Sequence, residues 1–413
     1  MVFSFKISFA SSLNTNQLDM EIKQIKVNNF KSLVDFELPL DKFSCLVGLN
    51  GSGKSTVLQC FDFLSQQVKG NMTGWLEKWQ WKASDLNSKL TAKQNIDFEI
   101  VLRHANHFDV IWKASFNWRT LRCTSELIQW NKKLIFEVKN GKYRMLSLNE
   151  QNSKEPKTID FDYQGSLISQ IKPSQLTQEI LALKKYFEGL HTLSLLEPEY
   201  LKKQTRQQAS LGLGGEGLSA FLYHLEEKER NFIQEKMAQI YPSIKQFNVS
   251  QMRSGFKKLM IQEQFKETTL EIESRHIADG FLRLLAVFAQ LSQEQNFLLL
   301  DEIENGINPE RIEFLTDTLV NARPQVLITT HSPMVLNYLE DEIAKSGVVY
   351  LYKTQNGATQ AVRLFDLPSM RQKLKFMGPG EVYDDTLLTQ LVEEINDSVQ
   401  KSETVSRFSQ KGN

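Results

Sequence analysis

The 413-residue chain has no excess of charge of either sign, because 49 lysines and arginines balance 49 aspartates and glutamates. No overall electrostatic field therefore draws it to nucleic acid or to an anionic membrane, and any polyanion site must be a local patch. The sequence also lacks an apolar run approaching the roughly 18 residues that a membrane-spanning helix needs. We therefore expect no membrane partner, and no transporter with fused membrane spans.

Cysteine is scarce. The three residues Cys45, Cys60 and Cys123 form neither an even set nor a metal-ligand spacing, so the sequence offers no disulfide framework and no cysteine metal site. We expect a cytoplasmic protein. The hydrophobic fraction of 41% is enough for a sizeable core, and the length suits one large or two modest domains.

The most informative segment is rich in glycine and runs from Gly48 to Thr56 as GLNGSGKST. It follows the apolar run Phe43–Val47, which predicts a buried strand, and it precedes apolar residues at helical spacing. A strand, a glycine-rich turn and a helix start make a cradle for phosphates. The residues expected to hold a nucleoside triphosphate are Gly48, Asn50, Gly51, Ser52, Gly53, Lys54, Ser55 and Thr56.

Within this P-loop the residue types have separate roles. Lys54 is expected to reach the β- and γ-phosphates, and the Ser55 hydroxyl to take one site on Mg²⁺. ATP and Mg²⁺ are therefore the expected ligands. A loop that merely turns is the alternative interpretation, and the flanking strand and helix patterns disfavour it.

Two further strand ends carry polar side chains. The apolar run Phe297–Leu300 ends in Asp301 and Glu302, and the run beginning at Val326 leads to His331. Beside a P-loop, Asp301 would lie near Mg²⁺ and Glu302 would face the γ-phosphate, where a carboxylate can deprotonate the attacking water. A solvent-exposed strand end and a structural histidine are the plain alternatives. Parallel strands that end at one sheet edge favour the catalytic interpretation for Lys54, Glu302 and His331.

Together these segments resemble the Walker A, Walker B and switch-histidine motifs of ABC-type ATPases. The stretches Val27–Leu33, Asp279–Leu285 and Asp301–Pro309 resemble more narrowly the RecF/SMC-like branch. The likeness is nearest to its stand-alone AAA ATPase domain proteins and to the ATPase half of OLD-family nucleases. It spans about residues 20–380.

The resemblance implies an α/β fold of the P-loop NTPase class and ABC type. Its mixed or parallel sheet would be flanked by helices, with an antiparallel β lobe and a short helical insertion in place of a long coiled coil. Expected strands include Glu21–Val27, Ile96–Leu102, Asp109–Phe116, Leu134–Val138, Tyr143–Leu148, Gln325–Ile328 and Val348–Tyr352, and expected helical runs are Gln175–Leu190 and Leu218–Tyr241.

The expected organisation has five parts. They are a flexible extension (1–19), an N-terminal P-loop half with the antiparallel lobe (20–170), a helical insertion (171–255), a C-terminal ATPase half (256–380), and a C-terminal helix and tail (381–413). The C-terminal ATPase half would hold the signature, Walker B and the switch histidine.

Family membership also implies a head-to-tail homodimer in which each protomer's ATP meets the partner's signature segment. Here that segment is Ala278, Asp279 and Gly280, at the start of a predicted helix, and an N-cap by Asp279 is the alternative. The family commonly has serine where Ala278 stands. Loss of that hydroxyl weakens the contact by roughly 1 kcal/mol, so slow hydrolysis is expected.

The resemblance further implies that Asn305 and Gly306 lie on the dimer-facing loop after Walker B. A glutamine that contacts Mg²⁺ or water is also implied. Gln80 and Gln94 are both candidates, and the sequence does not choose between them.

Three outputs of such an ATPase are consistent with the sequence. The first is a nucleotide-gated switch in DNA-related processes or anti-phage defence. Cations interleaved with Trp118 and Trp130 support it faintly, and a solvated lobe face is the favoured explanation of the same residues. The second is a regulatory or scaffolding ATPase that controls a separate effector, such as a nuclease or toxin. The third and weakest is a self-contained nuclease, because the acidic pairs Asp160/Asp162 and Asp384/Asp385 lack further metal ligands nearby.

Overall fold

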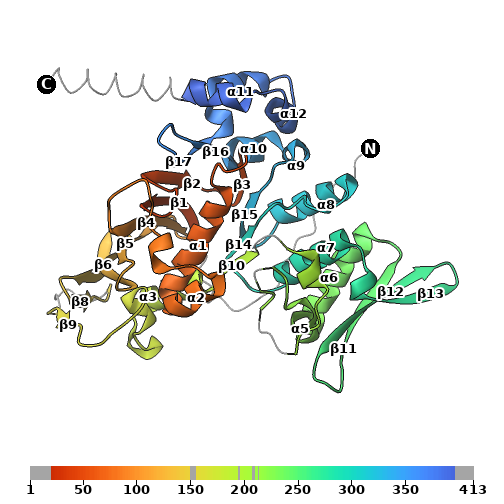
Figure 1. Ribbon diagram of the computed structural model, residues 1–413, viewed down its shortest axis with the longest axis horizontal. Helices are drawn as coiled ribbons and strands as arrows, with labels where there is room; N and C mark the ends of the chain where they lie inside the picture. Colours follow the sequence, from red (N-terminus) through yellow and green to blue (C-terminus); the bar gives the residue numbers. More distant parts are fainter. Residues whose placement is uncertain (1–19, 149–154, 194–195, 207–209, 213, 396–413) are drawn as a thin grey trace.

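The computed structural model describes residues 20–148, 155–193, 196–206, 210–212 and 214–395 (Figure 1). The expected flexible extension 1–19 and the tail 400–413 lie outside these residues. Within the described part of the chain, the strands form sheets of eight, six and three strands.

The six-stranded sheet is mixed and runs in the order β10-β14-β15-β3-β16-β17. Five of its strands pair in parallel, and β17 is antiparallel to β16. This arrangement confirms the predicted mixed sheet. The bounds are β3 (Phe43–Val47), β10 (Leu190–Leu193), β14 (Phe297–Leu300), β15 (Gln325–Thr329), β16 (Val348–Lys353) and β17 (Thr359–Arg363).

This sheet separates two hydrophobic cores because successive side chains of a strand point to opposite faces. In β14, Phe297 and Leu299 join one core, and Leu298 and Leu300 join the other. Both faces are covered, so β3, β14, β15 and β16 are buried along nearly their whole length, as is typical of parallel sheets. The sequence predicted these four strands, whereas it missed the more polar β10 and β17.

The eight-stranded sheet is antiparallel and forms the predicted lobe, at the left of Figure 1. Its order is β2-β1-β4-β5-β6-β7-β8-β9. The bounds are β1 (Met20–Asn28), β2 (Phe36–Pro39), β4 (Asn95–His104), β5 (Asp109–Asn117), β6 (Arg122–Trp130), β7 (Lys133–Lys139), β8 (Lys142–Met145) and β9 (Lys157–Thr158). The predicted runs missed β6, because a register shift and the buried Glu126 interrupt its alternation.

Helices cover both faces of the central sheet. Side chains of α1 share the first core with those of the antiparallel lobe, whereas α7 lies in the second core. The longer helices are α1 (Lys54–Lys69), α2 (Met72–Trp79), α3 (Gln178–Glu188), α6 (Glu227–Ile240), α7 (Asp279–Leu291) and α8 (Pro309–Val320). The shorter ones are α4 (Pro198–Leu201), α5 (Leu218–Tyr223), α9 (Pro333–Asn337), α10 (Asp341–Gly347), α11 (Pro368–Lys373) and α12 (Pro379–Asp384). No helix in the described ranges is long and apolar enough to cross a bilayer.

The segment 171–255 is not simply helical, which corrects part of the prediction. Strand β10 lies within it and belongs to the central sheet, and β11 (Ile244–Gln251) opens a three-stranded antiparallel sheet with β12 (Lys257–Phe265) and β13 (Thr268–Glu273). This sheet projects at the lower right of Figure 1. Its strands were missed because few of their side chains are buried, so hydrophobic alternation is weak. The five domain boundaries stay a prediction.

The predicted helix Leu218–Tyr241 is also two helices. The first ends at its C-cap His224 and the second begins after its N-cap Glu226, where the Glu229 side chain accepts a bond from the Glu226 backbone. This reciprocal capping interrupts the helical run.

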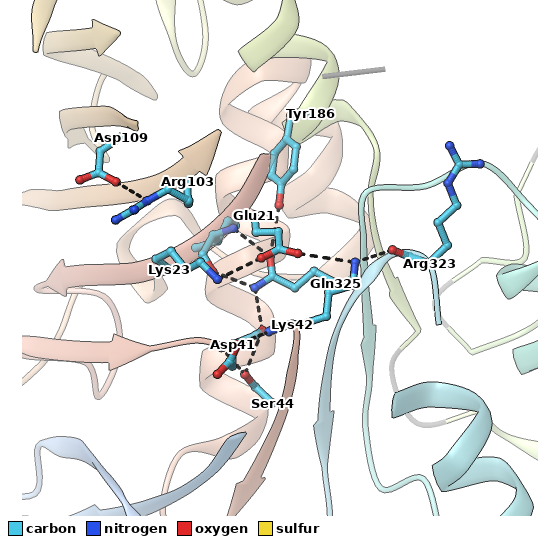
Figure 2. Close-up of polar contacts among 11 residues, drawn as sticks. Glu21, Lys23, Asp41, Lys42, Ser44, Arg103, Asp109, Tyr186, Arg323 and Gln325 are labelled. Atoms are coloured by element: carbon cyan, nitrogen blue, oxygen red, sulfur yellow. Dashed lines mark hydrogen bonds and ion pairs between the residues drawn. The ribbon is translucent and has the colours of Figure 1, made fainter. Parts of the chain in front are cut away.

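A buried glutamine ties the central sheet to the lobe. Gln325 begins β15 and is 1% exposed. Its Nε2 donates to the carbonyls of Ile22 (2.7 Å) and Asp41 (2.9 Å), while its Oε1 accepts from the Ile22 amide (2.8 Å) and the Tyr186 hydroxyl (3.4 Å). Figure 2 shows these contacts converging from three parts of the chain. The start of β15 is therefore fixed relative to β1, the turn before β3, and α3.

We expect Gln325→Leu to lower the free energy of unfolding by about 2–3 kcal/mol, because it leaves buried backbone groups of Ile22 and Asp41 without partners. Urea unfolding measures the change. Gln360→Leu is the matched control, since its amide donates at the chain surface to Val34 and Asp35 carbonyls. Equal losses in both variants would contradict the role assigned to Gln325.

Candidate functional site

The glycine-rich loop leaves β3 and enters α1 through three residues with positive φ. The φ values are 146° at Gly48, 77° at Gly51 and 112° at Gly53, a region that favours glycine. A Cβ on Gly48 would lie 2.3 Å from the Leu351 carbonyl oxygen, and one on Gly53 would lie 2.3 Å from Thr359 Oγ1. At Gly51 the space beside the backbone is open. The glycines therefore allow the loop's backbone conformation, and at Gly51 they leave space for a ligand beside the backbone.

The start of α1 is arranged to receive an anion. Gly53 is the N-cap, no side chain caps the helix, and its first turn holds no acidic residue. The Ser52 hydroxyl is buried without a partner. Uncapped amides at the positive end of the helix dipole suit phosphate oxygens. The loop therefore fits the triphosphate that the sequence predicts.

Lys54 lies in the loop with its side chain folded back. Its Nζ donates to the carbonyls of Gly48 (2.8 Å) and Leu49 (3.2 Å). Burial lowers the pKa of the Lys54 ammonium, and the nearby carboxylates of Asp301, Glu302 and Glu304 act in the opposite direction. A cation held by carbonyl oxygens can exchange these partners for phosphate oxygens.

Asp301 faces the P-loop from the end of β14. Its Oδ2 accepts from the Ser55 hydroxyl (3.4 Å), and its Oδ1 accepts from the Thr329 hydroxyl at the end of β15. A hydroxyl beside a carboxylate suits Mg²⁺, which usually keeps several waters and phosphate oxygens as its other ligands. In the described ranges no group of three or more His, Cys, Asp or Glu side chains is placed to hold a metal. Ser55 and Asp301 would thus hold Mg²⁺ together with a bound triphosphate.

Glu302 has a constrained backbone. Its φ of 47° is unusual for a residue other than glycine. The Glu302 amide donates to Thr329 Oγ1 (2.9 Å), and its carbonyl accepts from the Asn305 amide (3.1 Å). Strain of this kind persists where the surrounding structure enforces it, and it clusters at functional sites. The Glu302 side chain is 38% exposed, so its carboxylate remains accessible.

His331 lies close to Glu302. Its Nε2 is 3.9 Å from Glu302 Oε1, and its backbone amide donates to Glu304 Oε1 (2.8 Å). The second carboxylate oxygen of Glu304 is buried without a partner. Glu304 thus fixes the turn that carries His331.

The structure therefore brings Lys54, Ser55, Asp301, Glu302 and His331 to one edge of the central sheet. Sequence reasoning missed Thr329, which bridges Asp301 and the Glu302 backbone, and Glu304. A threonine at the end of the strand beside the Asp301 strand was the available signal, because neighbouring strand ends share one sheet edge.

The three signature residues lie elsewhere. Ala278, not Asp279, is the N-cap of α7, and no side chain caps the helix, so the alternative interpretation of Asp279 as an N-cap is wrong. Asp279 instead accepts from Lys202 Nζ (2.6 Å). A Cβ on Gly280 would lie 2.3 Å from the Gly306 carbonyl oxygen. In the described part of the chain, no hydrogen bond or ion pair joins these residues to the P-loop of the same chain.

The two candidate glutamines are both exposed. Gln80 is the C-cap of α2, and the backbone carbonyl of Gln94 accepts from Asn87. Within the described ranges, neither side chain forms a hydrogen bond with Ser55 or Asp301. The choice between them stays open.

Three of the seven cations that could contact nucleic acid in the antiparallel lobe have local partners. Arg144 pairs with Glu137 (2.7 Å), and Arg119 and Arg122 lie over the rings of Trp118 and Tyr163. The further cations that the sequence interpretation grouped with them are Lys132, Lys133, Lys139 and Lys142.

Trp130, one of the two expected stacking residues, is 5% exposed and packs against His104 and Phe108. A buried indole offers no stacking face to a base. The suggestion that Trp130 stacks on nucleic acid is therefore wrong.

Comparison with known proteins places this geometry in context. A family model described as "AAA ATPase domain" matches residues 20–282. The OLD nuclease of Thermus scotoductus is 22% identical over 335 residues, which cover 76% of this chain and 59% of that protein. The arginine transport ATP-binding protein ArgV of Corynebacterium glutamicum is 32% identical over 81 residues, which cover 18% of this chain and 32% of that protein. The chain thus spans less than two thirds of either curated relative.

Two solved structures share the fold. One is an Smc head bound to the C-terminal winged-helix domain of ScpA, with a TM-score of 0.52, 14% identity, and coverage of 83% of this chain and 96% of that one. The other is an Smc head with an extended coiled coil bound to the C-terminal domain of ScpA, from Pyrococcus furiosus. Its TM-score is 0.53 at 12% identity, with coverage of 86% and 100%. At these identities the likeness concerns the fold alone.

Thr329→Val should weaken Mg²⁺-dependent ATP binding about tenfold, because Asp301 and the Glu302 amide lose a shared hydroxyl. Titration with a fluorescent ATP analogue, with Mg²⁺ and with EDTA, measures the effect. Thr329→Ser keeps the hydroxyl and should bind like the unaltered protein. Equal affinity of the valine and serine variants would refute the bridging role.

Proposed function

The chain belongs to the AAA ATPase domain family, and from that premise we propose that it hydrolyses ATP as a nucleotide-gated head-to-tail dimer. The reaction is ATP and water to ADP and phosphate. The observation that carries the proposal is the convergence of Lys54, Ser55, Asp301, Glu302 and His331 at the ends of β3, β14 and β15. Phosphoryl transfer needs positioning and charge stabilisation more than covalent chemistry, and this edge offers both.

Each side chain has a physical role in the proposed reaction. Lys54 and the amides at the start of α1 would bind the β- and γ-phosphates, and Ser55 and Asp301 would hold Mg²⁺, which neutralises phosphate charge when bound. Glu302 accepts the proton of the attacking water as it adds to the γ-phosphorus. His331, 3.9 Å from the Glu302 carboxylate, helps to orient it and the γ-phosphate.

The position of α7 supports dimerisation, because its first turn makes no hydrogen bond or ion pair with the P-loop of the same chain in the described residues. Its uncapped first turn, at Ala278, Asp279 and Gly280, is free to contact a γ-phosphate held by a second copy. The expected slow turnover follows from alanine at position 278.

Two outputs remain under this proposal. A DNA-related or anti-phage role rests on the fold of the RecF/SMC-like branch. The burial of Trp130 and the local partners of Arg119, Arg122 and Arg144 weaken direct support for nucleic-acid contact. The alternative is control of a separate effector protein. It is favoured by the projecting three-stranded sheet, where the large apolar side chains Met252, Phe265 and Leu270 are 41–50% exposed.

The relative from Thermus scotoductus is named a nuclease, and this chain spans 59% of it. We therefore include a nuclease on another chain among the possible effectors. A nuclease site within the described residues is the least supported alternative, since Asp385 pairs with Lys373 and no metal-binding cluster occurs there.

Glu302→Gln should trap a dimer in the presence of ATP and Mg²⁺, because binding remains while proton acceptance fails. Light scattering coupled to gel filtration should show the mass of the chain doubling with ATP. The double variant Glu302→Gln/Lys54→Ala is the control and should stay monomeric. A Glu302→Gln variant that binds ATP tightly as a monomer contradicts the dimer mechanism.

Ala278→Ser should raise kcat, because the hydroxyl restores a contact to the partner's γ-phosphate. It should also cap α7 and add about 0.5–1 kcal/mol to stability. Ala278→Gly, which lacks the hydroxyl, is the control. Steady-state ATPase assays and thermal unfolding separate the two effects, and greater stability without a higher kcat would show that position 278 does not contact the nucleotide.

A further inference from the structure

Arg283 is a largely buried cation whose Nε has no hydrogen-bond partner. It lies on α7 and is 8% exposed. Within the described ranges, the guanidinium forms neither a hydrogen bond nor an ion pair. Burial of a charged group without partners is costly, and buried polar groups are normally satisfied. The presence of this arginine therefore calls for a physical reason.

The guanidinium lies against the loop that follows Glu302. A Cβ on Gly306 would be 3.6 Å from Arg283 Nε and 3.8 Å from its Cζ. One turn earlier on α7, Gly280 is in such close contact with the Gly306 carbonyl that no side chain fits. The start of α7 and this loop are therefore packed in direct backbone contact.

The same loop reaches the proposed general base. The Asn305 amide donates to the Glu302 carbonyl (3.1 Å), and Asn305 Nδ2 donates to Glu302 Oε2 (3.4 Å). Gly306 is thus linked through one residue to the Glu302 carboxylate.

Three carboxylates act electrostatically on Arg283 without forming an ion pair with it. Burial lowers the pKa of the Arg283 guanidinium, and Asp279, Glu302 and Glu197 oppose that shift. An arginine remains charged under these conditions. Its positive charge is therefore attracted both by Asp279 at the start of α7 and by Glu302 at the end of β14.

Asp279 already has a partner in the isolated chain. Lys202, the C-cap of α4, donates to Asp279 Oδ1 at 2.6 Å. Asp279 also stands four residues before Arg283, a spacing at which helical side chains can pair. Two cations can thus compete for this one carboxylate.

We propose that Arg283 is a positioning residue that couples the start of α7 to Glu302 of the same chain. It does so by replacing Lys202 as the ion-pair partner of Asp279. A γ-phosphate presented by the partner at the first turn of α7 attracts Lys202. Asp279 is then free to pair with Arg283, and the loop at Gly306 shifts with the guanidinium. Each protomer thereby senses the partner's nucleotide before it hydrolyses its own. The inference rests on the dimer proposed above.

The test measures kcat, KM and ATPase rate per protomer against protein concentration. Arg283→Gln should lower kcat about tenfold, within the usual range of coupling between sites, with KM changed less than about twofold. The rate should no longer rise with protein concentration. Arg283→Lys should restore part of kcat, because it retains the charge.

Asp279→Asn covers the case in which Arg283→Gln fails to fold, since the Asp279 side chain is 48% exposed. It should reproduce the loss of kcat at unchanged KM. Arg311→Gln is the matched control: this half-buried arginine on α8 donates to the Tyr241 hydroxyl, and its loss should leave kcat within about twofold, as expected for a residue outside the site.

Failure of the coupling role of Arg283 can be distinguished from failure of the dimer proposal. If Glu302→Gln forms the ATP-dependent dimer and Asp279→Asn keeps an unaltered kcat, the coupling role of Arg283 is wrong and the dimer stands. Parallel falls in kcat, ATP affinity and melting temperature for Arg283→Gln, without rescue by lysine, also overturn it, because they mark a purely structural residue. Absence of the Glu302→Gln dimer refutes the proposed function itself.

Discussion

The parallel pairing of β14, β15 and β3 is the constraint on which the site depends. Leu300 pairs with Ile328, and Ile328 pairs with Cys45, so the three strands end within two residues of one another. Asp301 follows the first strand, Thr329 ends the second, and the P-loop follows the third. A shift of one residue in this register would turn each side chain to the opposite face. The hydrogen bonds from Ser55 and Thr329 to Asp301 are consequences of this alignment.

The register is maintained from both faces and from the far end of the sheet. Alternate side chains of each strand enter two separate cores, so a slipped strand would lose contacts on both sides. At the start of β15, the four hydrogen bonds of Gln325 set the strand's position relative to β1 and β3. Rigid support at a distance is what allows a strained Glu302 backbone and an uncapped α1 to persist.

Much of the site could be predicted from the sequence because its residues lie at the ends of uniformly apolar strands. Phe43–Val47 and Phe297–Leu300 predict buried parallel strands. Polar residues that directly follow such strands lie at one edge of the sheet. The antiparallel lobe was also evident from its alternation. The projecting sheet was not, since β13 is almost wholly exposed and its pairing with β12 leaves little trace in the pattern of hydrophobic residues.

Other features depend on contacts that no local pattern encodes. The role of Thr329 follows from its position beside Asp301, and that of Arg283 from burial against Gly306, which lies on another element. Glu302 can be named as a candidate base from its place after Asp301, but its positive φ is visible only in the folded chain. Sequence thus predicted that Lys54, Asp301, Glu302 and His331 meet, and packing adds the residues that hold them in place.

The central claim is that this sheet edge holds half of a nucleotide site and that the start of α7 in a second copy completes it. A structure of the chain with Mg²⁺ and a non-hydrolysable ATP analogue tests this most directly. The account predicts two protomers related head to tail, with the γ-phosphate between Lys54 of one and the first turn of α7 of the other. A fully enclosed nucleotide within a single protomer, with α7 directed away from any phosphate, would contradict it.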